Sequence, residues 1–339
     1  MSQPFRWAVI GPGRIANRFA EALQGVPGAE LVAVLGRDAA RSLAFAERWK
    51  PGEDRLPRVA AGAADLLGST DVDAVYIATP HAQHGEWIER CLQAGMPVLC
   101  EKPLVPNLVQ GEALVALARE RQVFLMEAVW TRFLPIYAVV QRWLAEQAIG
   151  KICGMQSSFC FVSPYEPDGR VFNPALAGGA LLDIGIYNLT VTRWVLQAAL
   201  GACPEARSIS ALGQLAPTGV DQRVAATLDF GQGLCSQFIC AVDTCADNAF
   251  RIFGERGTIT LPSDFWQATE AVLQRPGEAL EHVQAAHLVN GFEGEIAHAQ
   301  DCIRAGLIES AVIPHAETLA TLAWMDEIRA QLGVRYPFE

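Results

Sequence analysis

The chain has 339 residues, a length typical of two or three domains that each bury a hydrophobic core. Apolar residues make up 51% of the sequence and charged residues 19%, a balance that excludes an intrinsically disordered chain. The 26 basic and 37 acidic residues leave a net charge of −11, which argues against a general nucleic-acid-binding protein.

No uninterrupted apolar run reaches the roughly 18 residues that a membrane-spanning helix needs, so we expect no membrane segment. The first seven residues, MSQPFRW, lack the basic start and long apolar stretch of a signal peptide. We therefore expect a cytoplasmic protein whose nine cysteines stay reduced. The three closest, Cys235, Cys240 and Cys245, would face alternate sides of a strand, so we expect buried thiols rather than a metal site.

The first third of the sequence alternates short apolar runs with amphipathic segments. We predict strands at residues 7–10, 31–35, 72–78, 97–100 and 123–127. Helices are predicted between them at residues 15–23, 37–49, 87–93 and 108–119. This alternation predicts a doubly wound parallel sheet, an α/β Rossmann domain, over residues 1–127.

The pattern changes after residue 150. We predict strands at residues 152–162, 224–230, 234–242, 249–253 and 258–261. Helices are predicted at residues 180–197, 292–305 and 317–332. Residues 128–339 should therefore form a second, α+β domain with an antiparallel sheet, whose last helix can pack back on the first domain.

The segment GPGRIA, residues 11–16, follows the first strand and opens the first helix, where it fits the pattern G-x-G-x-x-A. Gly11 permits the tight turn, and Gly13 lets the backbone approach a pyrophosphate. The helix N-terminus offers free N–H groups to the phosphates. We predict a dinucleotide site that includes Gly11, Gly13, Arg14 and Ile15, and a plain structural turn is the alternative.

The residues at the end of the second strand distinguish a site for NAD from a site for NADP. NAD sites usually carry Asp or Glu there for the ribose 2′-hydroxyl, whereas this run ends in Arg37 and Asp38, with Arg41 one helical turn later. A guanidinium can hold a 2′-phosphate through paired hydrogen bonds, so we predict NADP(H) binding through Arg37 and Arg41. In the competing interpretation Arg37 is solvated and Asp38 serves an NAD ribose, which makes NAD the less favoured cofactor.

Two further segments follow strand ends at the same edge of the predicted sheet. Thr79 and His84 follow one strand, and Glu101-Lys102-Pro103 follows the next. Ligands bind at the carboxyl ends of parallel strands, so we expect Thr79, His84, Glu101 and Lys102 at the cofactor. A lysine there can donate a proton or a hydrogen bond to a carbonyl oxygen that gains charge as hydride arrives.

Two residue pairs have spacings that could suggest a metal. His81 and His84 form H-x-x-H, and Glu295 and His298 are three apart on a predicted helix. Neither pair has a third and fourth ligand nearby. We expect a helix cap or cofactor contact for the first pair, a solvated helix face for the second, and no metal site.

These motifs together resemble the Gfo/Idh/MocA oxidoreductase family. The resemblance rests on GPGRIA at 11–16, ATP at 78–80 and EKP at 101–103, and it runs nearly from end to end. MEAVWTRF at 126–133 and GGALLDIGIY at 178–187 are similar to the branch that contains dimeric dihydrodiol dehydrogenases, NADP-dependent D-xylose dehydrogenases and glucose–fructose oxidoreductase. The resemblance implies a Rossmann domain followed by a domain with a large open, mostly antiparallel sheet.

The resemblance also implies an active-site role for Lys102 and for the helix that faces the nicotinamide. Many members have Asp-x-x-x-His on that helix, whereas this sequence has Asp183 and Tyr187, as the dihydrodiol dehydrogenase branch does. Residues four apart share one helical face. A phenol is a better acid than base at neutral pH, and the ammonium group of Lys102 would favour its anion.

We predict from this that Tyr187 transfers the proton at the substrate oxygen and that Lys102 supplies electrostatic stabilisation. Asp183 would orient Lys102 or bind a substrate hydroxyl. The alternative for Tyr187 is a core tyrosine with a satisfied hydroxyl. Candidate walls of a substrate pocket are Trp130, Arg132, Phe161 and Trp266, although Trp130 could equally lie in a core or a domain interface.

The predicted function is that of an NADP(H)-dependent oxidoreductase that moves hydride between nicotinamide and a sugar or vicinal diol, or the matching carbonyl compound. The alternatives are a redox-neutral lyase or glycosidase with a tightly held cofactor, and a non-catalytic NADP(H)-sensing protein. The family commonly pairs through the open face of its sheet, so the resemblance implies a homodimer or larger homo-oligomer.

Overall fold

The computed structural model describes residues 3–52 and 55–339. The chain divides into two compact units. Unit 1 holds the residues up to Phe133 together with Leu288–Ala320, and unit 2 holds Leu134–His287 together with Thr321–Glu339. This division differs from the predicted contiguous domains 1–127 and 128–339, because a segment late in the chain returns to unit 1.

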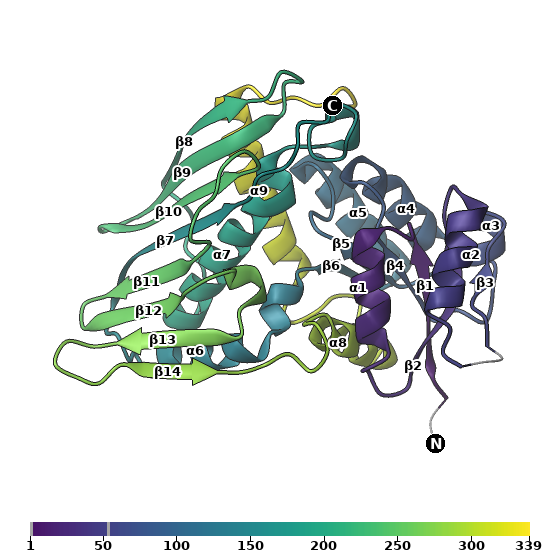
Figure 1. The fold of residues 1–339 in the computed structure, drawn as a ribbon, viewed down its shortest axis with the longest axis horizontal. Coiled ribbons are helices and arrows are strands. Elements are labelled where there is room, and N and C mark those ends of the chain that lie inside the picture. The colour runs from purple at the N-terminus through teal and green to yellow at the C-terminus, as the bar shows by residue number, and fades with distance from the viewer. Residues whose placement is uncertain (1–2, 53–54) are drawn as a thin grey trace. The chain divides into compact units, whose positions relative to one another are not determined.

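Unit 1 contains a six-stranded parallel sheet in the order β3-β2-β1-β4-β5-β6 (Figure 1), which confirms the predicted doubly wound sheet. Its strands are β1 (Phe5–Ile10), β2 (Ala29–Leu35), β3 (Arg58–Val59), β4 (Ala74–Ile77), β5 (Val98–Glu101) and β6 (Leu125–Ala128). The connecting helices are α1 (Arg14–Leu23), α2 (Ala39–Arg48), α3 (Ala63–Leu67), α4 (His81–Gln93) and α5 (Leu108–Arg121). The strand order reverses between β1 and β4, which opens a crevice at the carboxyl edge of the sheet.

Aromatic side chains lock α1 to this sheet. Phe19 of α1 stacks on Tyr76 of β4 with ring centroids 3.9 Å apart, and Trp7 of β1 meets Phe19 edge-on at 5.4 Å. All three side chains are fully buried. The packing fixes the position of α1 and therefore of the glycine turn in front of it.

The segment after residue 288 packs on the end of this sheet. Its helix α8 (Glu293–Arg304) packs against α1 and against the 3-10 helix Trp130–Phe133. The Leu125 nitrogen of β6 donates to the Ile308 oxygen at 3.1 Å, and the His315 Nε2 lies 2.9 Å from the Leu125 oxygen. These contacts place part of the predicted second domain in unit 1.

Unit 2 contains an eight-stranded sheet in the order β14-β13-β12-β11-β7-β10-β9-β8 (Figure 1). Its strands are β7 (Ile152–Cys160), β8 (Ser208–Leu215), β9 (Asp221–Gly231), β10 (Leu234–Ala241), β11 (Phe250–Gly254), β12 (Gly257–Leu261), β13 (Glu270–Gln274) and β14 (Glu281–Gln284). The pairings are antiparallel except for β7 with β10, which run parallel. The sheet is therefore mixed but mostly antiparallel, as predicted.

Helices cover one face of this second sheet (Figure 1). The helix α7 (Ile186–Leu200) packs on β7 and β10, and α6 (Pro135–Ala145) packs on α7, β13 and β14. Within β9 the residues Val224 and Ala226 are buried, whereas Ala225 between them and Arg223 before them are exposed. The strand thus has one covered face and one open face. The remaining helix, α9 (His315–Leu332), belongs to unit 2 from Thr321 onward.

Several elements were not predicted from the sequence. The missed strands are β3, β8, β13 and β14, and the missed helices are α3 and α6. β3 has only two residues, and β8 and β14 are exposed or half-exposed on both faces, so neither carries a hydrophobic alternation. α6 begins with a proline at its first position, within the join between the two predicted domains.

The structure also bears on the expectations about membrane segments, reduced cysteines and metal sites. Residues Pro174–Leu200 are long and apolar enough to span a membrane, but 89% of their most apolar window is buried, as in the core of a globular protein. All nine cysteines are free thiols, with Cys240 buried and Cys245 exposed. Within residues 3–52 and 55–339, no three His, Cys, Asp or Glu side chains gather as metal ligands would.

Candidate functional site

The glycine turn between β1 and α1 borders a pocket of about 730 Å³ at the carboxyl ends of β1, β2 and β4. Gly11 has φ +87°, and a Cβ there would lie 2.8 Å from the Ala78 oxygen and 2.9 Å from the Thr79 nitrogen. Only glycine fits this position. Gly13 caps α1 without a side chain, so the N–H groups of the first turn, which begins with Arg14 and Ile15, remain available to an anion.

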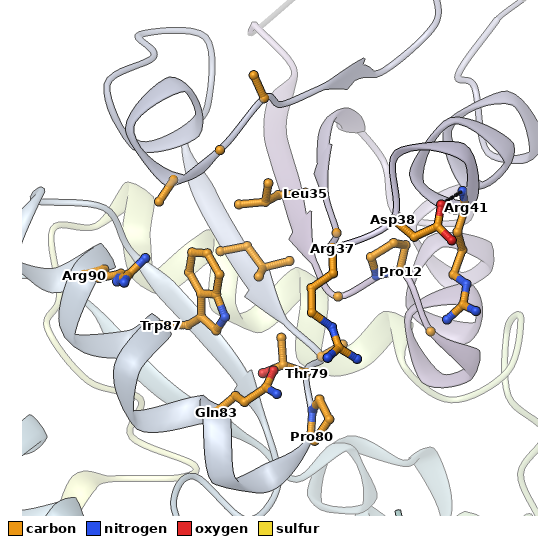
Figure 2. A pocket seen from close by; sticks show the side chains of 18 residues that line it. Pro12, Leu35, Arg37, Asp38, Arg41, Thr79, Pro80, Gln83, Trp87 and Arg90 are labelled. Atoms are coloured by element: carbon orange, nitrogen blue, oxygen red, sulfur yellow. Dashed lines mark hydrogen bonds between the residues drawn. The ribbon is translucent and has the colours of Figure 1, made fainter. Parts of the chain in front are cut away.

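The arginines predicted for a 2′-phosphate share this pocket. Figure 2 shows the Arg37 side chain extending toward Thr79 and Gln83, with Arg41 farther along α2. Asp38 is the N-cap of α2, and its Oδ1 accepts a hydrogen bond from the Arg41 nitrogen at 3.1 Å. Capping engages the Asp38 carboxylate with its own helix, which weakens the competing interpretation of Asp38 as the ribose ligand.

Residues of α4 form the opposite wall of the pocket, and these residues were not predicted from the sequence. Gln83, Trp87 and Arg90 all line the pocket (Figure 2), and their spacing of four and three residues places them on one helical face. The Arg90 guanidinium lies 5.3 Å from the Trp87 ring and pairs with Glu86 at 2.5 Å. The helical spacing directly after a strand end was the signal that could have identified this wall.

Thr79 and His84 differ in what they offer to a ligand. The Thr79 hydroxyl is buried at the pocket and has no hydrogen-bond partner in the part of the chain that the structure describes. The open helix end, this hydroxyl and the arginines together fit a phosphorylated dinucleotide. His84 is 0% exposed, and its Nε2 and Nδ1 lie 2.8 Å from the Thr79 oxygen and 2.9 Å from the Pro103 oxygen.

His84 connects two loops of unit 1, and its predicted contact with the cofactor stays a prediction. The buried ring ties the turn after β4 to the loop after β5, and burial lowers the pKa of His84. His81, also buried, meets the His84 ring edge-on at 5.8 Å.

Buried carboxylates hold the loop that carries Lys102. Glu101 accepts from the Tyr76 hydroxyl and, through Oε2, from the Lys102 nitrogen at 3.3 Å. Glu127 of β6 accepts from the Leu104 nitrogen at 2.8 Å, and burial raises its pKa to about 7. The Lys102–Pro103 peptide is cis, and the Lys102 side chain is half-exposed. Glu101, predicted as a cofactor ligand, thus also supports the backbone of Lys102.

In unit 2, Asp183 and Tyr187 lie where a short π-helix, Leu181–Gly185, continues into α7. Single π-turns of this kind occur often at functional sites. Arg170 donates two hydrogen bonds to the Asp183 carboxylate, at 2.7 and 3.1 Å. From the sequence, Lys102 or a substrate hydroxyl was expected as the partner of Asp183, and Arg170 was a weaker candidate for the substrate pocket; the bidentate pair of the two residues was not predicted.

An aromatic cluster surrounds Tyr187, which is 6% exposed. Its ring lies 5.6 Å from the Phe159 ring, and Phe159 stacks on Trp266 at 3.3 Å. Trp266, predicted as a pocket wall, therefore stacks on the ring that lies next to Tyr187. Phe161 is half-exposed and donates its backbone N–H to the Ala241 oxygen at 3.0 Å. Phe159, two residues earlier in the same apolar run, is the residue that the sequence analysis passed over.

Trp130 and Arg132, the other two predicted pocket residues, are buried and make contacts within unit 1, and their place at a substrate pocket stays a prediction. Trp130 is 2% exposed, and its ring lies 4.8 Å from the Phe292 ring and 4.8 Å from the Arg18 guanidinium. The Arg132 guanidinium reaches the Val312 oxygen at 3.3 Å and Glu317 at 3.5 Å. The returning segment 288–320 supplies Phe292, Val312 and Glu317 among these partners, and a local motif contains no information about them.

Comparisons with known proteins cover almost the whole chain. The sequence profile of the oxidoreductase family with an NAD-binding Rossmann fold, Gfo/Idh/MocA, matches residues 5–129, and the Gfo/Idh/MocA C-terminal domain matches residues 137–260. The trans-1,2-dihydrobenzene-1,2-diol dehydrogenases of Mus musculus and Homo sapiens are each 33% identical over 341 and 339 residues, with 98% of both chains covered.

Solved structures agree with these matches. KijD10, a 3-ketoreductase from Actinomadura kijaniata in complex with TDP-benzene and NADP, has a TM-score of 0.80 at 29% identity, covering 97% of this chain and 98% of that chain. The aldose-aldose oxidoreductase from Caulobacter crescentus complexed with glycerol has a TM-score of 0.84 at 23% identity, covering 98% of both chains, and shares the fold.

The two glycines of the turn predict different effects of substitution. Gly11→Ala should destabilise the cofactor-free protein by about 1–3 kcal/mol, because its Cβ would meet backbone atoms and its φ is positive. Gly13→Ala should leave that stability unchanged, since no atom lies within 3.9 Å of its Cβ position, but should weaken NADPH binding about tenfold or more by obstructing the pyrophosphate.

Thermal unfolding without cofactor and fluorescence titration with NADPH measure the two effects separately. Equal stability of both variants would contradict the packing argument for Gly11. Unchanged NADPH affinity in Gly13→Ala would contradict the placement of the pyrophosphate at this turn.

Proposed function

Because the chain belongs to the Gfo/Idh/MocA oxidoreductase family and acts on CH–OH groups, we propose that it is an NADP(H)-dependent oxidoreductase of sugars or vicinal diols, or of the matching carbonyl compounds. The observation that carries the proposal is the pocket in which an open helix end and Arg37 face the same space. The relatives named as dihydrodiol dehydrogenases and the aldose-aldose oxidoreductase that shares the fold support this class of substrate, and the 3-ketoreductase KijD10, solved with NADP, supports the cofactor.

The preference for NADP(H) rests on charge at the end of β2. Arg37 offers a planar pair of donors to a 2′-phosphate, while the Asp38 carboxylate caps α2. Trp87 and Arg90 close the pocket on the other side and offer a ring face and a further positive charge to the adenosine half of the cofactor.

Arg37→Ala should raise the KM for NADP⁺ by about 10–100-fold and change the KM for NAD⁺ less than about threefold, because only NADP⁺ carries the 2′-phosphate. Arg48→Ala is the matched control, since Arg48 ends the helix α2 that follows Arg37, and its guanidinium lies over the Trp49 ring, 4.9 Å away. Steady-state kinetics with both cofactors measures the difference. Equal increases for NADP⁺ and NAD⁺ would show that Arg37 does not select the phosphate.

In the proposed reaction, bound nicotinamide supplies or accepts the hydride. Tyr187 transfers the proton at the substrate oxygen, and the ammonium group of Lys102 stabilises negative charge that develops there. The Arg170–Asp183 pair offers both donors and a carboxylate to neighbouring hydroxyl groups. The stacked rings of Phe159 and Trp266 provide an apolar surface beside Tyr187 for the carbon skeleton.

Tyr187→Phe should lower kcat by roughly 100-fold or more while NADPH affinity stays unchanged, because it removes one proton-transfer group and no cofactor contact. Tyr165→Phe, at an exposed tyrosine of the same unit, is the control. Turnover is measured with NADP⁺ against aldoses and trans-diols, and with NADPH against osones and dicarbonyls. Full activity of Tyr187→Phe would refute the role assigned to the phenol.

We also propose a homodimer that pairs through the open face of the eight-stranded sheet. The face carries exposed small and apolar residues, among them Ala225 of β9 and Leu212 of β8, which is 80% exposed. Ala225→Arg should convert the dimer into a monomer by light scattering, because a charge would be buried in the contact. Val109→Arg, on the exposed side of α5, should leave the mass unchanged. A monomeric unsubstituted protein at working concentration would contradict the proposal.

A further inference from the structure

Asp221, the first residue of β9, is a buried carboxylate that the proposed chemistry does not use. It is 0% exposed, and its Oδ2 accepts a hydrogen bond of 2.6 Å from the nitrogen of Leu181. Leu181 is the first residue of the π-helix that contains Asp183 and leads into Tyr187. Asp221 thus lies directly behind the turn that presents the candidate catalytic groups.

Gly179 connects this carboxylate to both sides of the site. Its φ is +123°, and a Cβ there would lie 2.3 Å from the Asp221 Oδ1, so the close approach requires glycine. Its nitrogen donates to the Val171 oxygen at 2.9 Å, next to Arg170, and its oxygen accepts from the Asp183 nitrogen at 3.2 Å. The backbone of one glycine therefore fixes the spacing between the two partners of the Arg170–Asp183 pair.

The C-terminal segment braces the same glycines. The Tyr336 hydroxyl donates to the Gly178 oxygen at 2.7 Å. Arg329 lies 4.9 Å from the Tyr336 ring and is held by Asp326 at 2.8 Å and by Glu339 at 2.8 and 3.0 Å. The packing leaves the turn supported by β9 on one side and by this segment on another.

We propose that Asp221 is a positioning residue for the reaction: its carboxylate holds the amide end of the turn that carries Asp183 and Tyr187. The inference rests on the proposed role of Tyr187 in proton transfer. A π-turn is intrinsically less favourable than an α-turn, so an external acceptor is needed to hold its first N–H in place. A carboxylate serves best, because negative charge is favoured at the N-terminus of a helix.

The charge state of Asp221 should matter to this role. Burial raises its pKa to about 7, while the Leu181 and Ala180 N–H groups and the charge of Arg329 act in the other direction. The charge of Asp221 in turn raises the pKa of Tyr336 on the C-terminal segment and the pKa of Cys240 on β10. The ionised form is the stronger acceptor, so kcat should fall as the pH drops through about 7.

Asp221→Ala and Asp221→Asn test the proposal in the full-length protein. Asp221→Ala should lower kcat by about 10–100-fold and leave the KM for NADPH within about twofold, since it frees a buried N–H of unit 2, whereas the pocket assigned to the cofactor is lined by residues of unit 1. Asp221→Asn keeps an oxygen that accepts from Leu181 and should restore most of kcat, without the decline below pH 7. Asp229→Ala is the matched control: Asp229 lies on the same strand and bonds the Gly231 nitrogen.

Hydrogen exchange of residues 178–187 provides a readout that does not need activity. The amides there should exchange faster in Asp221→Ala than in the unsubstituted protein, and Asp221→Asn should lie between the two. Unchanged exchange together with unchanged kcat in Asp221→Ala would overturn the proposal. If Asp221→Ala does not fold, the pH profile and exchange of Asp221→Asn decide: a profile and exchange identical to those of the unsubstituted protein would overturn it.

The same experiment separates this inference from the proposed function. Full activity of Tyr187→Phe would contradict the proposed role of Tyr187 in proton transfer. Slower turnover of Tyr187→Phe with normal turnover of Asp221→Ala would contradict only the positioning role of Asp221. Loss of kcat in both variants, with faster exchange only in Asp221→Ala, is the result that we expect.

Discussion

In each of the two units, the candidate site residues depend on the same kind of interaction, a backbone N–H that donates to a buried carboxylate oxygen. In unit 1, Glu101 accepts from the Lys102 nitrogen and Glu127 from the Leu104 nitrogen, so the loop that carries Lys102 is held from two sides. In unit 2, Asp221 accepts from the Leu181 nitrogen in the same way. The side chains proposed to act on substrate are thus placed through their own backbone, by acids that need not touch the substrate.

Burying these carboxylates lowers the stability of the folded protein while it positions the backbone of the candidate site residues. Burial raises the pKa of Glu127 and of Asp221 to about 7, well above their values in an unfolded chain. The folded protein therefore binds more protons than the unfolded one between about pH 4 and 7, and the stability contributed by these groups is lost as the pH rises through that range. Glu295 of α8 adds to the same trend, because burial and the charge of Glu101 raise its pKa. The hydrogen bonds from backbone N–H groups offset part of this cost.

Local patterns in the sequence predicted the parallel sheet, the turn at Gly11 and the placement of Arg37 in a shared pocket. They did so because strand alternation, a glycine turn and a strand end are all encoded by neighbouring residues. Resemblance to a family, rather than pattern, supplied Lys102 and Tyr187. The roles of Glu127 and Asp221 could not be read in advance, since an acid in a strand shows neither its burial nor its partner. The surroundings of Trp130 and Arg132 could not be read in advance for a related reason: partners of both lie in a segment more than 150 residues later in the chain.

Transfer of deuterium from labelled cofactor tests the central claim most directly. The protein is incubated with NADPH that carries two deuterium atoms at C4 of the nicotinamide and with a panel of osones and cyclic dicarbonyl compounds, and the products are analysed by mass spectrometry. The account predicts deuterium at the new carbinol carbon, with NADP⁺ formed in equal amount. A product without deuterium, or one that forms without consumption of NADPH, would contradict it.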